Sequence, residues 1–144
     1  MRVLVQRSLN ASVSVDEKIT GSIDHGMVVF VGFTQRDTIE EIKYLVNKII
    51  NLRIYPDEFG VMNKSILETS GSILSISQFT LYANTKKGNR PSYTESLEPG
   101  QAKVLYDLFN EELKKYIQVE TGIFGADMKV MLQNDGPVTI QLER

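Results

Sequence analysis

Apolar and polar positions alternate along the first third of the chain, which is the pattern of half-buried β-strands. The alternating apolar residues are Val3, Val5, Ala11, Val13 and Val15. An apolar run, "MVVFVGF", follows from Met27 to Phe33. Turn-forming residues at "LN", "DEK" and "DHG" separate these segments, so the pattern predicts a meander of strands.

Two later segments repeat apolar residues at helical spacing. In the first, "RDTIEEIKYLVNKII", the periodic positions are Ile39, Ile42, Val46 and Ile49. Asp37, with Glu40 three residues later, resembles a capping box at the start of this helix. In the second, residues 98–117, Pro99 suits the first turn of a helix. The apolar face of the second helix would consist of Ala102, Leu105, Phe109, Leu113 and Tyr116.

The segment between the helices, "SILSISQFTLYA" at residues 72–83, is rich in Ile, Phe and Tyr and too short for a helix of its own. Its composition predicts a buried strand. Because side chains alternate along a strand, Gln78 and Thr80 would lie on one face and Ser77 and Phe79 on the other, unless a bulge intervenes.

The C-terminal segment alternates on both sides of a Gly-Pro pair. The apolar positions are Met128, Val130 and Leu132 before the pair, and Val138, Ile140 and Leu142 after it. Proline has no N–H to give to a sheet and Gly136 can take a positive φ, so "NDGP" predicts a hairpin turn between two strands. We therefore expect an α+β fold, with a mostly antiparallel sheet or barrel and two main helices packed on it.

Size and composition narrow the class of protein. The 144 residues suit one domain, 1–144, with a substantial core. No cysteine is present, so disulfides, thiolate metal sites and a cysteine nucleophile are excluded. We see no signal peptide or membrane-spanning run and expect a cytoplasmic protein. The net charge of −2 argues against a protein that coats nucleic acid through bulk electrostatics.

Most common catalytic arrangements are missing. His25 is the only histidine and lies in "IDHGM", which we interpret as a surface turn. No pair of residues has the spacing of metal ligands, and the glycines fit neither a P-loop nor a dinucleotide-binding motif. The polar side chains of Gln78 and Thr80 either form cross-strand hydrogen bonds or serve a function. Thr80 as a nucleophile lacks an evident neighbouring base.

Two loops are further candidates for function. In "TGIFGADMKV", Gly122 and Gly125 surround Phe124 and permit close approach of the backbone, either to a ligand or simply in a turn before a strand. The loop "TKKGNRP" gathers Lys86, Lys87 and Arg90 within five positions. A basic loop of this kind is either a solvated surface or a local contact for nucleic acid.

Taken together, four motifs in this order resemble the D-aminoacyl-tRNA deacylase family. They are "SQFTLYA" at 77–83, "KGNRPSY" at 87–93, "TGIFGADM" at 121–128 and "NDGPVTI" at 134–140. The likeness covers the whole chain, including "RIYPDEFGVMNKS" at 53–65. Tyr55 and Tyr93 stand where phenylalanine is common in the family, and both departures are conservative.

The resemblance implies a cytoplasmic homodimer that hydrolyses the ester of D-aminoacyl-tRNA, rejects the L form, and clears glycine mischarged on alanine tRNA, without a cofactor. It implies a cis peptide bond between Gly136 and Pro137, in a turn that enters the active site of the partner subunit. The receiving pocket would be lined by Ser77, Gln78, Phe79 and Thr80 and completed by Phe124, Gly125 and Ala126. Lys86, Lys87 and Arg90 would contact the tRNA phosphates.

Two questions stay open at this level. Thr80 either orients groups while the 2′-hydroxyl of the tRNA's terminal adenosine helps to activate water, or acts as a covalent nucleophile. The activity itself has two rivals: a non-enzymatic module that binds RNA or protein through the basic loop, and a general Ser/Thr esterase that would act on small esters without tRNA.

Overall fold

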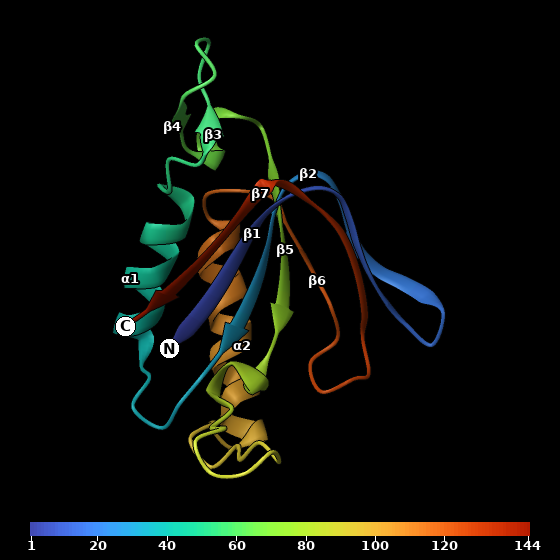
Figure 1. The fold of residues 1–144 in the computed structure, drawn as a ribbon, viewed down its shortest axis with the longest axis vertical. Helices are drawn as coiled ribbons and strands as arrows, with labels where there is room; N and C mark the ends of the chain where they lie inside the picture. The colour runs from blue at the N-terminus through green and yellow to red at the C-terminus, as the bar shows by residue number, and fades with distance from the viewer.

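Two long strands, β1 (Arg2–Val15) and β2 (Lys18–Gly32), form the central hairpin of a five-stranded sheet. The strand order is β6-β5-β2-β1-β7 in this computed structural model, which describes residues 1–144 (Figure 1). The remaining elements are α1 (Ile39–Ile50), β3 (Tyr55–Pro56), β4 (Met62–Lys64), the 3₁₀ turn η1 (Ile66–Glu68), β5 (Ser72–Ser77), the 3₁₀ turn η2 (Phe79–Tyr82), α2 (Pro99–Lys114), β6 (Val119–Thr121) and β7 (Lys129–Glu143). Neither α-helix combines the length and the hydrophobicity needed to cross a membrane.

The first third forms one long hairpin instead of a meander with three turns. The turn at "DEK" is confirmed, with Asp16 and Glu17 at φ +47° and +64° between β1 and β2. The turns expected at "LN" and "DHG" are wrong, because the ladder continues through both places. Asn10 and Gly26 take positive φ values there, which bends the strands without ending them. His25 lies within β2, is exposed and pairs with Leu9.

The sheet is mixed. β1 pairs in antiparallel fashion with β2 and β7, whereas the β2–β5 and β5–β6 pairs are parallel. Parallel neighbours require a crossover connection. The segment that contains α1 connects β2 to β5, and the segment that contains α2 connects β5 to β6 (Figure 1). The expected α+β class with two helices is confirmed, while the strand pattern alone did not reveal the parallel half of the sheet.

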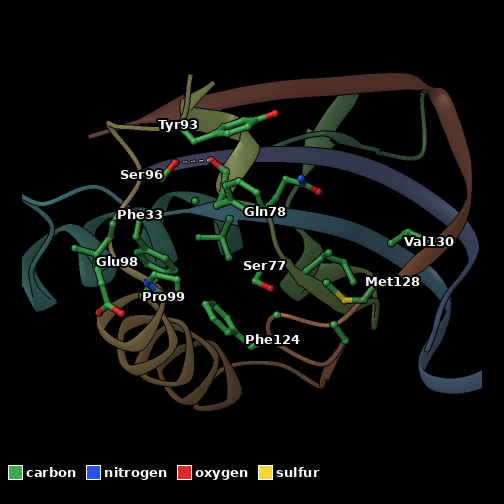
Figure 2. A pocket seen from close by; sticks show the side chains of 18 residues that line it. Phe33, Ser77, Gln78, Tyr93, Ser96, Glu98, Pro99, Phe124, Met128 and Val130 are labelled. Atoms are coloured by element: carbon green, nitrogen blue, oxygen red, sulfur yellow. Dashed lines mark hydrogen bonds between the residues drawn. The ribbon is translucent and has the colours of Figure 1, made fainter. Parts of the chain in front are cut away.

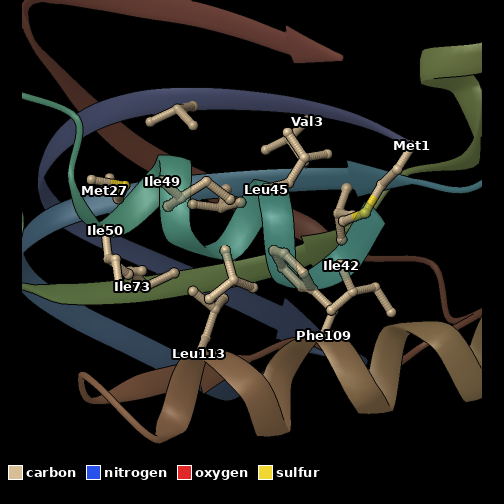
Figure 3. Packing of buried hydrophobic residues seen from close by; sticks show 14 of the residues in the cluster. Met1, Val3, Met27, Ile42, Leu45, Ile49, Ile50, Ile73, Phe109 and Leu113 are labelled. Carbon is tan, nitrogen blue, oxygen red and sulfur yellow. The ribbon is translucent and has the colours of Figure 1, made fainter. Parts of the chain in front are cut away.

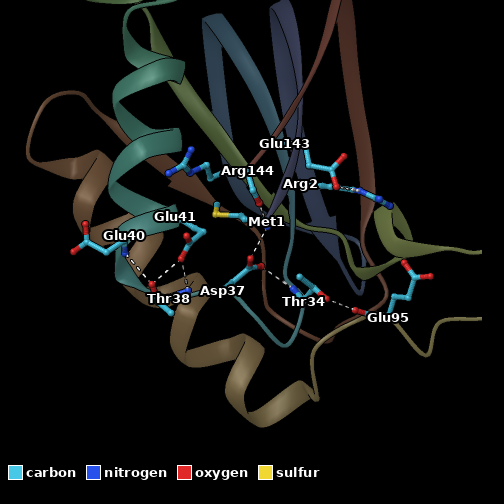
Figure 4. A network of polar contacts seen from close by, with 10 residues as sticks. All are labelled: Met1, Arg2, Thr34, Asp37, Thr38, Glu40, Glu41, Glu95, Glu143 and Arg144. Carbon is cyan, nitrogen blue, oxygen red and sulfur yellow. Dashed lines mark hydrogen bonds and ion pairs between the residues drawn. The ribbon is translucent and has the colours of Figure 1, made fainter.

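The cap of α1 lies one residue later than predicted. Thr38 is the N-cap, and the Glu41 carboxylate accepts hydrogen bonds from the Thr38 N–H at 2.9 Å and from its hydroxyl at 2.7 Å. Asp37 has a different partner, since its Oδ1 lies 2.5 Å from the amine of Met1 and its Oδ2 accepts from the N–H of Thr34 (Figure 4). The predicted α2 is confirmed from Pro99 to Lys114, with Pro99 in its first turn, but Tyr116 lies beyond its end and is 53% exposed, so its place on the apolar face is wrong.

The main core lies between the helices and one face of the sheet (Figure 3). Its fully buried members include Val3, Met27, Ile42, Leu45, Ile49, Ile73, Phe109 and Leu113. The other face of the sheet carries a smaller cluster of Ala11, Val13, Ile23, Val28, Leu74 and Ile76. Phe30, Met128, Val130 and Leu132 pack on this second cluster and stay only partly buried. The sheet therefore has one covered face and one half-covered face.

β7 is a single edge strand with an interruption, not a hairpin. Asn134 pairs with Ser8 and Thr139 pairs with Gln6, so the residues between them stand opposite Arg7 alone. The halves before and after this interruption both pair with β1, so the expected hairpin turn at "NDGP" is wrong. We call the interruption, residues 135–138, the β7 bulge. Bulges of this kind bend an edge strand and project residues away from the ladder.

The close approach of β2 and β5 generates a stability prediction. Gly26 and Ser72 are the first pair of the parallel β2–β5 ladder. A Cβ at Gly26 would lie 1.9 Å from the carbonyl oxygen of Ser72. We expect Gly26→Ala to lower the free energy of unfolding by more than about 3 kcal/mol, because the start of β5 would have to move. Gly60→Ala is the matched control, since Gly60 also has positive φ but a Cβ there would meet nothing within 4 Å. It should cost about 1 kcal/mol in urea titrations, and equal losses for both variants would contradict the assignment.

Candidate active site

The candidate site forms where β5 ends. β5 pairs with β2 as far as Ser77 opposite Val31, and the N–H of Gln78 donates to the carbonyl of Val31 at 2.7 Å. β2 then ends at Gly32, so no partner strand remains and the chain turns into η2. The strand predicted over residues 72–83 is therefore wrong beyond Ser77. The expected alternation of side-chain faces ends there too.

The first turn of η2 has two free backbone donors. The N–H groups of Phe79 and Thr80 fall where a short helix offers no acceptor of its own. Neither makes a hydrogen bond to a neighbouring loop or side chain. Adjacent free N–H groups of this kind are suited to bind negative charge that develops on an oxygen.

A cavity of about 560 Å³ opens beside this turn. Its size and its 11 hydrophobic residues out of 18 are typical of a site for a small ligand. Figure 2 shows Tyr93 and Phe124 on opposite sides of the cavity, with Ser77 and Gln78 between them. The candidate residues that line the cavity are Ser77, Gln78, Phe79, Phe124, Gly125 and Ala126.

Thr80 is the one residue of the "SQFT" candidates that does not line the cavity. Its hydroxyl contacts the side-chain amide of Gln78, which does line it. Thr80 is therefore placed to orient Gln78. The Thr80 hydroxyl itself is not part of the cavity wall.

Charged side chains are scarce in the cavity. Glu98 is the only one on its wall, and it also caps α2 by accepting hydrogen bonds from Gly100 at 2.9 Å and Gln101 at 3.1 Å. The hydrogen bond from the Gly100 N–H, followed by that from Gln101, lowers the pKa of Glu98, so its carboxylate stays ionised at the helix end. His25 lies elsewhere, with its Nε2 3.0 Å from the carbonyl oxygen of Thr69. No group of three acidic or histidine side chains is close enough to hold a metal.

Phe124, on the side of the cavity opposite Tyr93, is held in place by Tyr106 of α2. Phe124 precedes Gly125, which takes φ +77° in the turn between β6 and β7. The Phe124 ring packs on Tyr106 with ring centroids 5.8 Å apart. The buried Tyr106 hydroxyl donates to the carbonyl of Ser75 in β5 at 2.8 Å. Burial raises the pKa of Tyr106, so the phenol remains a protonated donor and ties α2 to the sheet.

Gly136 and Pro137 lie away from the cavity of their own chain. Both are exposed, neither lines the cavity, and the peptide bond between them is cis. Val130 does line the cavity, and Gly136 follows it six residues later along β7, roughly 20 Å at the rise of a strand. The structure therefore does not bring the predicted chiral turn and the predicted pocket together within one chain.

Arg7 holds the β7 bulge from beneath. Its Nη1 donates to the carbonyl of Ile54 at 2.5 Å, and its Nε lies 2.8 Å from the Asp135 carboxylate. The Nε–Asp135 contact is an ion pair without the alignment of a hydrogen bond. A Cβ at Gly136 would lie 2.9 Å from Nη2 of Arg7, and the residue takes φ +116°, which L side chains rarely adopt, so this position favours glycine. Asn134 closes the bulge by donating its side-chain amide to the carbonyls of Arg7 and Val138.

The basic loop lies next to the cavity mouth. Lys86, Lys87 and Arg90 are exposed, and none of them pairs with a carboxylate. The loop is closed by two backbone hydrogen bonds between Asn84 and Ser92. Tyr93 follows directly and lines the cavity. The three cations are therefore free to contact an anionic ligand that extends beyond the mouth.

Sequence reasoning missed Arg7 as the residue that contacts the β7 bulge. The signal was present, because strand alternation places Arg7 on the same face as Val3 and Val5, which are buried. A charged residue on a buried face needs a specific partner. Tyr106 was also missed, and no sequence signal separates it from an ordinary core tyrosine.

Comparisons with known proteins show the family and the fold of the chain. A sequence model of the D-Tyr-tRNA(Tyr) deacylase family matches residues 4–143. The fold is similar to a solved structure named "c-Myc DNA Unwinding Element Binding Protein", with 40% sequence identity, a TM-score of 0.95, and coverage of 100% of this chain and 99% of that one. It is also similar to the solved structure of a probable eukaryotic D-amino acid tRNA deacylase, with 19% identity, a TM-score of 0.83, and coverage of 98% and 97%.

The resemblance found in the four motifs is thus confirmed over nearly the whole chain. The chain belongs to the D-Tyr-tRNA(Tyr) deacylase family and is a hydrolase of the ester bond in D-aminoacyl-tRNA.

Proposed function

We propose that the protein is a chiral proofreading enzyme of translation, in which two copies of the chain build each active site together. One copy contributes the cavity beside η2, and the other contributes the β7 bulge with Gly136 and Pro137. The observation that carries this proposal is the separation within one chain between an open cavity and an exposed, rigidly held bulge. The proposal places the enzyme in the cytoplasm, where charged tRNA is used.

The half-covered face of the sheet supports a second copy. Phe30, Val130 and Leu132 are only partly buried there. Met128 and Val130 also line the cavity, so this apolar surface is continuous with the site. A partner that covers the surface would remove apolar area from water and bring its own bulge near the cavity.

Rejection of L-amino acids follows from a wall made of backbone. The enzyme must accept many side chains and still detect the configuration at one carbon, so a pocket shaped to one side chain would fail. The carbonyl oxygens of Gly136 and Pro137 would bind the α-amino group of the substrate. A D side chain would then point into open space and an L side chain into the wall, which excludes it by repulsion. Glycine mischarged on alanine tRNA has no side chain to clash and would also be hydrolysed.

The chemical step uses backbone donors and water. Water adds to the ester carbonyl carbon, and the N–H groups of Phe79 and Thr80 stabilise the negative charge on the carbonyl oxygen. The bond from this carbon to the ribose oxygen then breaks, and the ribose oxygen takes up a proton. The free D-amino acid and tRNA are released. No histidine lines the cavity, so we assign activation of water to the neighbouring 2′-hydroxyl of the terminal ribose, with Thr80 orienting Gln78.

The chiral assignment predicts the outcome of a D-versus-L assay. Wild-type protein should release tyrosine from D-tyrosyl-tRNA and leave L-tyrosyl-tRNA intact. Pro137→Ala should reduce the D/L ratio of rates by at least about tenfold, the equivalent of about 1.4 kcal/mol, because the wall loses its shape. Pro56→Ala is the control, since Pro56 is exposed in β3 and outside the cavity.

Three results of this assay would count against the proposal. If Pro137→Ala still discriminated fully between D- and L-tyrosyl-tRNA, the bulge would have no role in chiral selection. Absence of turnover on either ester would favour a binding module, and the neighbour named for DNA unwinding element binding makes nucleic acid the ligand to test first. Hydrolysis of small esters without tRNA would favour a general esterase.

The role of Thr80 generates a second prediction. Thr80→Ala should lower kcat about tenfold, the value of one lost hydrogen bond to Gln78. A D-aminoacyl-tRNA that ends in 2′-deoxyadenosine should react far more slowly with the wild-type protein. Rapid-quench measurements should show no burst of released tRNA, because no acyl-enzyme forms. A trapped acyl-enzyme in wild type, together with complete loss of activity in Thr80→Ala, would make Thr80 the nucleophile.

A further inference from the structure

Two aromatic side chains stand exposed at the mouth of the cavity without a role in the reaction proposed above. Phe79 is 59% exposed and Tyr93 is 40% exposed, and both line the cavity. Their ring centroids lie 5.0 Å apart at an interplanar angle of 69°, an edge-to-face pair. Exposed apolar surface that is continuous with a binding site is a mark of ligand contact.

The ring of Tyr93 is held in place by the segment that carries it, residues 84–97. Asn84 and Ser92 exchange backbone hydrogen bonds of 2.8 and 2.9 Å, which closes the loop just before Tyr93. The Ser96 N–H donates to the carbonyl of Tyr93 at 3.0 Å, and its hydroxyl donates to the carbonyl of Phe79 at 3.0 Å (Figure 2). The two aromatic residues are thus joined through Ser96. A preorganised surface of this kind loses little entropy when a ligand binds.

The charge of the same segment indicates the class of ligand. Lys86, Lys87 and Arg90 lie in the loop that leads to Tyr93 and have no carboxylate partner. Unpaired nucleotides combine a flat base with a phosphate, and proteins bind them with aromatic rings beside cations. An uncharged peptide or an amino-acid side chain would use the ring and leave the cations without a function.

We propose that Tyr93, braced by Phe79, is the stacking surface for the unpaired base of the terminal nucleotide at the 3′ end of tRNA. This inference rests on the proposed function and adds the group that positions the ester. The ring would bind the base, the basic loop would contact the phosphates before it, and the ester would extend toward η2. Tyr93 is a positioning residue in this account, because it contacts the RNA and not the reacting atoms.

The test removes the ring and the base separately. Short acceptor-stem RNAs would carry D-alanine on a normal terminal adenosine or on a terminal ribose that lacks its base. For wild type we expect loss of the base to lower kcat/KM about tenfold or more, mainly through KM. Tyr93→Ala should lose a similar factor on the normal RNA and little further on the RNA without the base. Tyr93→Phe should stay within about twofold of wild type, because the ring is kept.

The control and the opposing results are distinct. Phe59→Ala removes a ring that is 83% exposed in the hairpin of β3 and β4, outside the cavity. It should leave kcat/KM on both RNAs unchanged. If Tyr93→Ala lost the same factor on both RNAs, its ring would contact the partner subunit or another group, and the proposal would be wrong. A loss that differed between D-alanyl and D-tyrosyl esters would instead assign the ring to the amino acid.

Failure of the proposed function would give a different result. In that case wild-type protein would hydrolyse neither RNA. Binding of the two uncharged RNAs, measured by fluorescence anisotropy on wild type and Tyr93→Ala, tests the stacking directly in either case. Equal affinities of wild type for RNA with and without the terminal base would overturn the inference.

Discussion

The contact between Arg7 and the β7 bulge is the constraint on which the proposed two-chain site depends. Arg7 lies on the buried face of β1, where its guanidinium joins the carbonyl of Ile54 to the carboxylate of Asp135. Position 136 takes φ +116° beside this guanidinium, a backbone conformation that favours glycine. With the guanidinium beneath it, the bulge projects outward from the edge of the sheet. Burial also raises the pKa of the nearby Tyr55 phenol, which stays neutral.

The cavity depends on a second constraint: β2 ends at Gly32, while the chain that forms β5 continues past Ser77 without a partner strand. The next residues turn into η2 with free N–H groups. A Cβ at Gly32 would lie 2.8 Å from the carbonyl oxygen of Gln78, so the close approach itself requires glycine. The free N–H groups of η2 and the β7 bulge, to which we assign oxyanion binding and chiral selection, therefore arise at two different interruptions of one sheet.

Local patterns in the sequence predicted the helices, the two-residue turn after β1 and the α+β class, because each depends on neighbouring residues. They failed where the outcome depends on a distant partner. "NDGP" has the residues of a hairpin turn, but β1 pairs with both flanking halves and makes it a bulge. "SQFT" has strand composition, but β2 is too short to extend the pairing. The motifs contain residues that line the cavity, although Thr80 does not. Strand alternation marks Arg7 as a charge on a buried face, but its partners and the role of Tyr106 became evident only from contacts across the fold.

Cross-linking tests most directly whether the bulge of one chain completes the cavity of another. The chain has no cysteine, so Pro137→Cys and Ser77→Cys would each introduce a single thiol. When the two variants are mixed and treated with a short bismaleimide, we predict a covalent product of twice the 16.3 kDa chain mass. A chain with both cysteines, diluted in excess wild type, should not link internally. Internal linkage in that diluted sample, with no product of doubled mass in the mixture, would contradict the account.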